Sequence, residues 1–198
     1  MKEKNLAVEL LKKLIAEQVS VYRRTNIVKS EKFSEIMQRA INAYLNGMLT
    51  NEEVIEEMLK LAKQIAADQK EGDKLGLNAD ELAFYDALTK PQAIKDFYEN
   101  EELIAITKEL ADTLRKNKTI DWQKRESARA KMRMLIKKLL KKHKYPPEGM
   151  DDAVQTVMTQ CELWTDNNSF EENHNVFTYT NNTEKTLPLV AEERVRYN

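Results

Sequence analysis

The sequence predicts an all-α protein, an irregular bundle of about six to eight helices with a C-terminal extended arm or small β-hairpin. Apolar residues recur at intervals of three and four along most of the chain, which is the period of amphipathic helices. Only four glycines and four prolines occur in 198 residues. That scarcity disfavours all-β architectures, because they need many tight turns. The length fits one helical domain, predicted over 1–166, with an appendage at 167–198.

The first helices are predicted from this periodicity and from residues that start or end helices. The segment 3–25 carries apolar residues on nearly two faces, so we expect it to be wedged between other helices. A second helix is expected to begin at a Ser30 N-cap and to end at Gly47. Thr50 and Glu53 have the spacing of a capping box, which would start a third helix. The short link between these two helices predicts an antiparallel hairpin.

A break at 72–77 separates this hairpin from the remaining helices. They are predicted at 79–88, 94–98, 101–116 and 151–164. Asn78 and Asp151 are the expected N-caps of the first and last of them. Beyond residue 166 the sequence is rich in Asn and Thr, so 167–198 is predicted to form an arm. Within it, the β-like residues 176–180 are expected to be extended or to form one side of a hairpin.

One segment is strongly basic. Residues 115–144 contain thirteen lysines and arginines and two acidic residues, a net charge of +11 in a chain whose total is −1. The stretch 119–147 predicts a cationic amphipathic helix that Asp121 caps and that the prolines at 146 and 147 end, because proline cannot continue a helix. Basic residues recur there mostly at intervals of four, along one face. The candidate contacts to a partner or to DNA phosphates are Lys124, Arg125, Arg129, Arg133, Lys137 and Lys141.

Three interpretations of this helix stay open. Its charge is either a solvated face balanced by the acidic segment 51–114, or a row of phosphate contacts that does not read sequence, or a docking surface for an acidic protein. Trp122 and Tyr145 flank the helix and either stack on bases or pack against neighbouring helices.

The sequence offers little for catalysis. It has no GxxxxGK[ST] motif for ATP and no GxSxG nucleophile motif. His143, His174 and Cys161 are too few for a recognisable metal-ligand pattern. Paired glutamates are interpreted as solvated helix faces and first-turn acids: Glu52/Glu53, Glu56/Glu57 and Glu101/Glu102. We therefore expect no catalytic, cofactor or metal site in this chain.

Cysteine usage and hydropathy bear on the compartment. A single cysteine excludes a disulfide framework within the chain and makes a reducing cytoplasm the expected location. No run of 18 or more apolar residues occurs, so we expect no membrane span.

Three stretches in succession resemble one protein family. They are FSEIMQRAINAYLNGMLTNEEVIEEMLKLAKQI, LGLNADELAFYDAL and TIDWQKRESARAKMRMLIKKLLKKHKYPP. In this order and spacing they are similar to the C-terminal helical domain of the R (restriction and motor) subunit of type I restriction–modification enzymes. The resemblance covers about residues 33–164.

The resemblance implies a role in assembly. It implies that this chain is part of a larger subunit, whose nuclease domain cuts DNA and whose two RecA-like domains use ATP and Mg²⁺ to translocate DNA. The helical domain would hold that subunit on the M and S subunits of the methyltransferase, with 3–25 as the connection from the motor domains. The alternative is a non-specific DNA-backbone-binding element that guides duplex DNA near the motor. No catalytic residue is carried over, because none of the nuclease or motor motifs occurs here.

Overall fold

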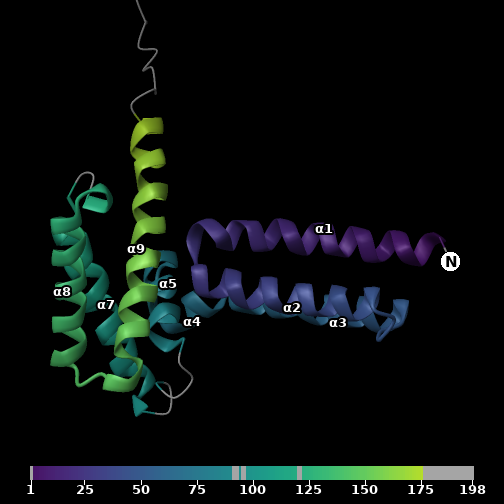
Figure 1. Ribbon diagram of the computed structural model, residues 1–198, viewed down its shortest axis with the longest axis horizontal. Coiled ribbons are helices and arrows are strands. Elements are labelled where there is room, and N and C mark those ends of the chain that lie inside the picture. The colour runs from purple at the N-terminus through teal and green to yellow at the C-terminus, as the bar shows by residue number, and fades with distance from the viewer. Residues whose placement is uncertain (1, 91–93, 95–96, 120–121, 176–198) are drawn as a thin grey trace, which may run out of the picture.

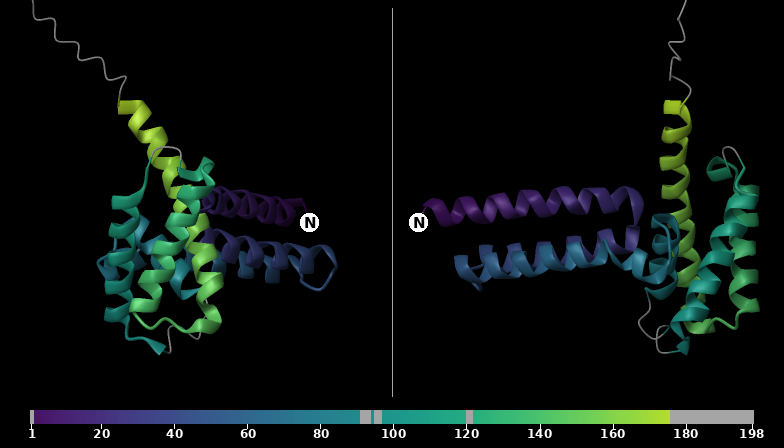
Figure 2. Two further views of the ribbon diagram at one scale, coloured as in Figure 1. Left: turned by 60° about the vertical axis from the view of Figure 1, so that its left-hand side comes forward. Right: turned by 180° about the vertical axis from the view of Figure 1, so that it is seen from behind.

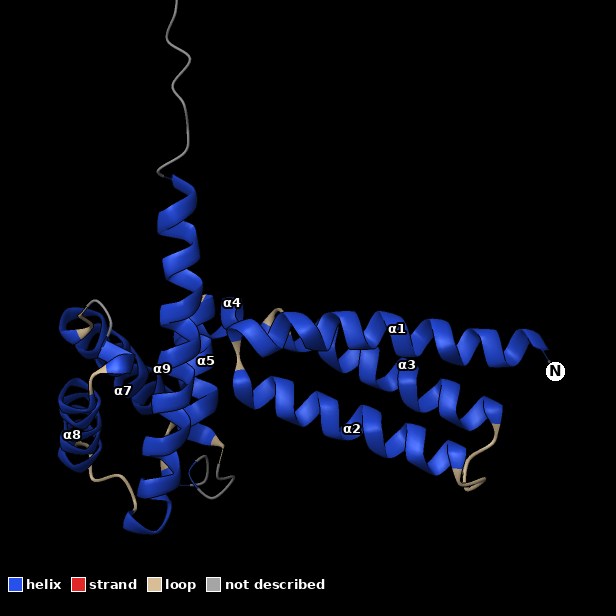
Figure 3. Cartoon of the chain, turned by 45° about the horizontal axis from the view of Figure 1, so that its top comes forward, coloured by secondary structure: helices blue, strands red, loops and turns tan. Residues whose placement is uncertain are grey.

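The structure is a computed structural model that describes residues 2–90, 94, 97–119 and 122–175. Every regular element within them is a helix, which confirms the predicted fold class (Figure 3). The elements are α1 (Lys2–Thr25), α2 (Ile27–Leu45), α3 (Asn51–Asp68), α4 (Glu71–Leu75), α5 (Ala79–Thr89), α7 (Asn100–Asn117), the 3-10 turn η1 (Trp122–Lys124), α8 (Glu126–Lys142) and α9 (Pro147–Asn175).

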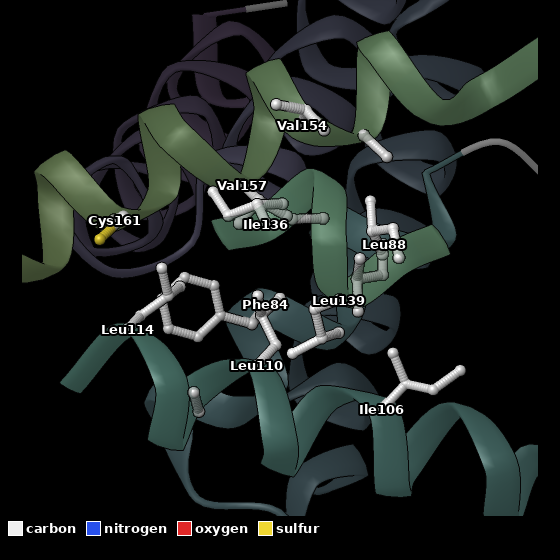
Figure 4. Close-up of a cluster of buried hydrophobic side chains, with 14 of the residues drawn as sticks. Phe84, Leu88, Ile106, Leu110, Leu114, Ile136, Leu139, Val154, Val157 and Cys161 are labelled. Atoms are coloured by element: carbon white, nitrogen blue, oxygen red, sulfur yellow. The ribbon is translucent and has the colours of Figure 1, made fainter. Parts of the chain in front are cut away.

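The helices form two parts with separate cores. Helices α1, α2 and α3 lie side by side as an elongated arm, whereas α5, α7, α8 and α9 form a body at one end of it (Figures 1 and 2). Side chains such as Ile15, Phe33 and Met58 fill the core of the arm. The core of the body is larger and includes Leu110 and Val157, which point toward each other from opposite helices (Figure 4).

Local capping signals fix several boundaries as predicted. Thr50 and Glu53 form the expected capping box, in which the Thr50 hydroxyl accepts from the Glu53 N–H and the Glu53 carboxylate accepts from the Thr50 N–H. Asn78 forms an equivalent box at the start of α5. Gly47 takes a left-handed φ of 71° just after α2, so α2 and α3 form the expected antiparallel hairpin.

The start of α2 differs from the prediction. Asn26, not Ser30, is the N-cap: its backbone is extended and its side-chain oxygen accepts from the Lys29 N–H at 3.1 Å. Ser30 lies buried inside the first turn. The predicted break at 72–77 was also too long, because residues 71–75 form α4. This helix ends at Gly76, which takes a left-handed φ of 62°.

Helix α1 is buried on one side only. Val8, Ile15 and Val19 pack into the core of the arm. The second apolar face is exposed, with exposed fractions of 70% for Leu6, 56% for Leu10, 49% for Leu14 and 56% for Val21. The prediction that this helix is wedged between others was therefore wrong, because α2 and α3 both cover the same side of it.

Helix α9 is longer than predicted at both ends. It begins at Pro147, where a missing N–H costs nothing because first-turn N–H groups lack intrahelical acceptors. Asp151 is therefore not its cap. The helix continues to Asn175, so the first residues of the C-terminal appendage predicted at 167–198 are helical (Figure 1). The β-like stretch 176–180 falls outside the described residues. So do residues 95 and 96 of the short helix predicted at 94–98, in which residues 94 and 97 are helical.

A buried polar cluster joins the arm to the body. The Asn26 side-chain amide donates to the Asp86 carboxylate at 2.6 Å, which links the N-cap of α2 to α5. The Lys29 ammonium lies 3.1 Å from the Glu71 carboxylate and 3.6 Å from that of Asp86. Gln160 of α9 closes the cluster, because its amide donates to the Thr25 carbonyl at 2.7 Å and accepts from the Ile27 N–H at 3.0 Å.

Lys29 is charged in this cluster. Burial alone would lower the pKa of its ammonium, but the neighbouring carboxylates of Asp86 and Glu71 outweigh burial and raise the pKa above its ordinary value. Separating a buried cation from its carboxylate partner is costly, because either group left alone would be an uncompensated buried charge.

We predict that Lys29→Met lowers the free energy of unfolding by about 3 kcal/mol, because it strands the carboxylate of Asp86. Urea unfolding followed by circular dichroism measures this. The control is Lys32→Met on the same helix: Lys32 is 47% exposed and pairs with Asp68 at 3.7 Å, so its loss should cost less than about 1 kcal/mol. Adding Asp86→Asn should restore part of the stability that Lys29→Met removes. Equal small losses in both single variants would contradict the role of the cluster.

Candidate functional site: the cationic helix

The described residues of the basic segment 115–144 form the end of α7, η1, α8 and the turn toward α9. Helix α8 begins at Glu126, after Arg125 as an N-cap without a side-chain hydrogen bond, so the predicted helix start near 121 was wrong. Asp121 itself lies outside the described residues. The helix ends at Lys142 rather than at the prolines, because Lys144 takes a left-handed φ of 56°. Pro147 begins the next helix instead.

Trp122 and Tyr145 lie in the core at the two ends of α8. The Trp122 side chain is fully buried, and its indole N–H donates to the Thr165 hydroxyl at 3.1 Å. Tyr145 is 3% exposed and its hydroxyl donates to the Leu88 carbonyl at 2.8 Å. Burial raises the pKa of this phenol above its ordinary value. Both rings pack against neighbouring helices, so neither presents a face on which a base can stack.

Several cations of the segment are engaged within the chain. The Arg129 guanidinium pairs with the Glu162 carboxylate of α9 at 2.5 Å and donates to the Gln123 carbonyl at 3.4 Å. The Lys137 ammonium lies 2.8 Å from the Asp151 carboxylate, whose pKa it lowers. These pairs fasten α8 to α9.

A second set of contacts fastens the end of α8 to α7. The Glu109 carboxylate lies 2.5 Å from the Lys142 ammonium and 2.7 Å from Nε2 of His143. The hydrogen bond from Lys142, and then that from His143, lower the pKa of Glu109 below its ordinary value of 4.5. This carboxylate is therefore ionised at neutral pH.

Four cations of α8 line one shallow hollow of about 530 Å³. We define the outer face of α8 as the residues that line this hollow: Ala130, Arg133, Met134, Lys137, Lys138 and Lys141. Within the described part of the chain, no ion pair joins Arg133, Lys138 or Lys141 to an acidic group. Lys124 and Arg125 are exposed near the start of the helix and do not line this hollow.

The structure regroups the predicted contacts. Of the six cations named from the sequence, it brings Arg133, Lys137 and Lys141 together on the outer face. The structure adds Lys138, which does not belong to the series of basic residues that are spaced four apart from Arg129 onward. The signal was present: once the buried Met132 and Ile136 fix the helix phase, Lys138 falls opposite them.

The environments of Cys161 and of the acidic residues bear on catalytic and metal chemistry. Cys161 is buried, and burial raises the pKa of its thiol to about 12, so the reactive thiolate is scarce at neutral pH. Among the residues that the structure describes, no three acidic, histidine or cysteine side chains converge as metal ligands. The paired glutamates have structural partners, such as Thr50 for Glu53 and Lys60 for Glu57. No helix in the described ranges combines the length and hydrophobicity of a membrane span.

Comparisons with known proteins point to one family. Residues 1–167 match the family described as type I restriction enzyme HindI endonuclease subunit-like, C-terminal. The chain is 39% identical over 159 residues to the type I restriction enzyme HindI endonuclease subunit of Haemophilus influenzae. It is 33% identical over 150 residues to the putative type I restriction enzyme MjaIXP endonuclease subunit of Methanocaldococcus jannaschii. These matches cover 80% and 75% of this chain but only 15% and 14% of the relatives. No solved structure matches significantly.

We predict that two arginines of α8 differ in their effect on stability. Arg129→Gln should lower the free energy of unfolding by about 1 kcal/mol, because it leaves the half-buried Glu162 without its cation. Arg133→Gln on the outer face should change it by less than about 0.5 kcal/mol. Thermal and urea unfolding of the two variants measure the difference. A larger loss for Arg133→Gln would mean that the outer face is bonded within the chain.

The lowered pKa of Glu109 predicts a pH dependence. A carboxyl group whose pKa is lower in the folded state stabilises the fold above its unfolded pKa, and this contribution is lost as pH falls through the folded pKa. Glu109→Gln should therefore be less stable than the parent chain at about pH 7, and the gap should close between about pH 5 and pH 2. Urea unfolding across this range tests it. A gap that widens toward acid would contradict the assignment.

Proposed function

Because the chain belongs to the family of C-terminal domains of type I restriction enzyme HindI-like endonuclease subunits, we propose that it is a non-catalytic assembly domain. In this proposal it docks the endonuclease subunit onto the M and S subunits of the methyltransferase, in the cytoplasm. ATP, Mg²⁺ and DNA cleavage would belong to other parts of the parent subunit. The chain spans about one seventh of its relatives' length, which leaves room for those parts.

The observation that carries this proposal is the exposed apolar face of α1. We call it the apolar stripe and define it as Leu6, Leu10, Leu14 and Val21. At 3.6 residues per turn these positions fall on one side of the helix, away from the buried Val8 and Ile15. Single exposed apolar residues are ordinary, but a row of them along a helix is typical of an interaction site. Burying each leucine in a partner would contribute roughly 1.5–3 kcal/mol.

The position of the stripe favours a protein partner. The arm projects from the body, so α1 is accessible along most of its length (Figures 1 and 2). Apolar side chains form the cores of protein interfaces but make no contact with phosphates. Lys13 is exposed beside the stripe, as the polar rim of such an interface requires, whereas Glu17 lies within the row, between Leu14 and Val21.

Size-exclusion chromatography of the chain with its cognate methyltransferase, without DNA, tests the proposal. We expect co-elution, and we expect the double variant Leu10→Ser/Leu14→Ser to bind at least about 10-fold more weakly, since losing about 1.4 kcal/mol already gives that factor. The matched control is Leu45→Ser/Met48→Ser. These residues are also exposed on the arm, at 73% and 74%, but lie outside the stripe.

The outcomes test two claims separately: that the apolar stripe is the docking surface, and that the chain docks onto the methyltransferase at all. If both double variants bind like the parent chain, the stripe is not the docking surface. If the parent chain itself does not co-elute, the docking role is wrong for this chain.

A further inference from the structure

We propose that the outer face of α8 is a second interaction site, which binds the phosphate backbone of duplex DNA without reading its sequence. This site is separate from the apolar stripe and takes a different partner. In Figures 1 and 3, helix α8 lies at the edge of the body on the side away from the arm. A long polymer can therefore pass along it without meeting the arm.

The charge on this face is not balanced within the described part of the chain. After Glu126, α8 contains no acidic residue. Arg133, Lys138 and Lys141 have no ion pair among the described residues, and only Lys137 reaches an acidic group, Asp151. Asp151 is itself 88% exposed, so solvent screens its attraction for Lys137.

Such a face is unfavourable on its own. Like charges three or four residues apart on a helix repel by roughly 0.2–0.5 kcal/mol per pair, and Arg133 with Lys137, Lys137 with Lys141, and Lys138 with Lys141 have these spacings. An anionic partner would convert this repulsion into attraction. The contrast with Arg129 and Lys142, each held by a carboxylate, shows that the chain neutralises the cations that face its own helices.

The dimensions fit a nucleic-acid backbone. From Arg133 to Lys141 the helix rises about 12 Å, at about 1.5 Å per residue. One strand of duplex DNA carries a phosphate about every 3.4 Å of the axis, so roughly four phosphates of that strand fall within this length. Every cation of the outer face can therefore have a phosphate within reach.

The composition of the face favours phosphate over an acidic protein. Three of its four cations are lysines, and lysine is depleted in protein interfaces, whereas arginine and aromatic residues are enriched. Met134, at 60% exposure, is its only large apolar side chain. The flanking aromatics, Trp122 and Tyr145, are buried and cannot stack on bases. Contacts of this kind fix position on the backbone and carry no sequence information.

Fluorescence anisotropy with a labelled duplex tests the proposal on the whole 198-residue chain. Binding should weaken steeply between about 50 and 200 mM salt, with a logarithmic slope of about −0.9 for each phosphate neutralised, and two unrelated sequences should bind equally. The triple variant Arg133→Gln/Lys138→Gln/Lys141→Gln should bind more weakly and make the slope shallower by about 2.7, that is, about 0.9 for each cation removed.

The control variant is Lys63→Gln/Lys70→Gln/Lys74→Gln, which removes the same charge from exposed positions outside α8. It should keep the slope of the parent chain. Thermal unfolding verifies that both triple variants are folded.

Three results would overturn the proposal. They are no binding by the parent chain at the lowest salt, equal weakening in both triple variants, or unchanged binding by the α8 variant. If the α8 variant lost only its binding to the methyltransferase, the face would be a protein-docking surface instead. The inference does not rest on the proposed docking role, because Leu10→Ser/Leu14→Ser should bind DNA like the parent chain.

Discussion

The arrangement of the molecule depends on the buried charge of Lys29. It lies where the arm meets the body, between Asp86 of α5 and Glu71 of α4. The apolar cores of the two parts are separate, but Val28 of α2 packs against the core of the body. Directional polar contacts add to this packing in fixing the angle between the two parts, because hydrogen bonds and ion pairs tolerate little displacement once water is excluded. Asn26 and Gln160 complete this set by fixing the ends of α1 and α2 against α5 and α9.

Helix α8 shows how one basic segment can serve two purposes. The cations on its flanks, such as Arg129 and Lys142, pair with carboxylates of α9 and α7 and hold the helix in the body. On the outer face, Lys137 also reaches Asp151 of α9, whereas Arg133, Lys138 and Lys141 have no ion pair among the described residues. The overall charge of −1 conceals this division, because it averages over segments of opposite sign. Local charge therefore indicates more about binding here than net charge does.

Sequence reasoning succeeded where the determinants are local and failed where they are distant. The capping box at Thr50 needs only a residue three positions away, and it was predicted. Asn26 is an exception, because its capping contact with the Lys29 N–H is local and was still missed; only its second bond, to Asp86, spans 60 residues. Helical periodicity identified two apolar faces on α1 but could not tell how many neighbours the helix has. For the same reason, the sequence did not distinguish Arg129, which pairs with Glu162, from the cations of the outer face.

The connection between α1 and α2 consists of the single residue Asn26, whose side chain is buried and bonded to α5. A loop of several residues would absorb tension by straightening, but here there is no slack to take up. Pulling on α1 would load the hydrogen bonds around Asn26 and Gln160 directly and would pass the force into α5 and α9. The arm is therefore coupled to the body like a rigid lever, and displacement of a partner held by α1 would turn the whole domain.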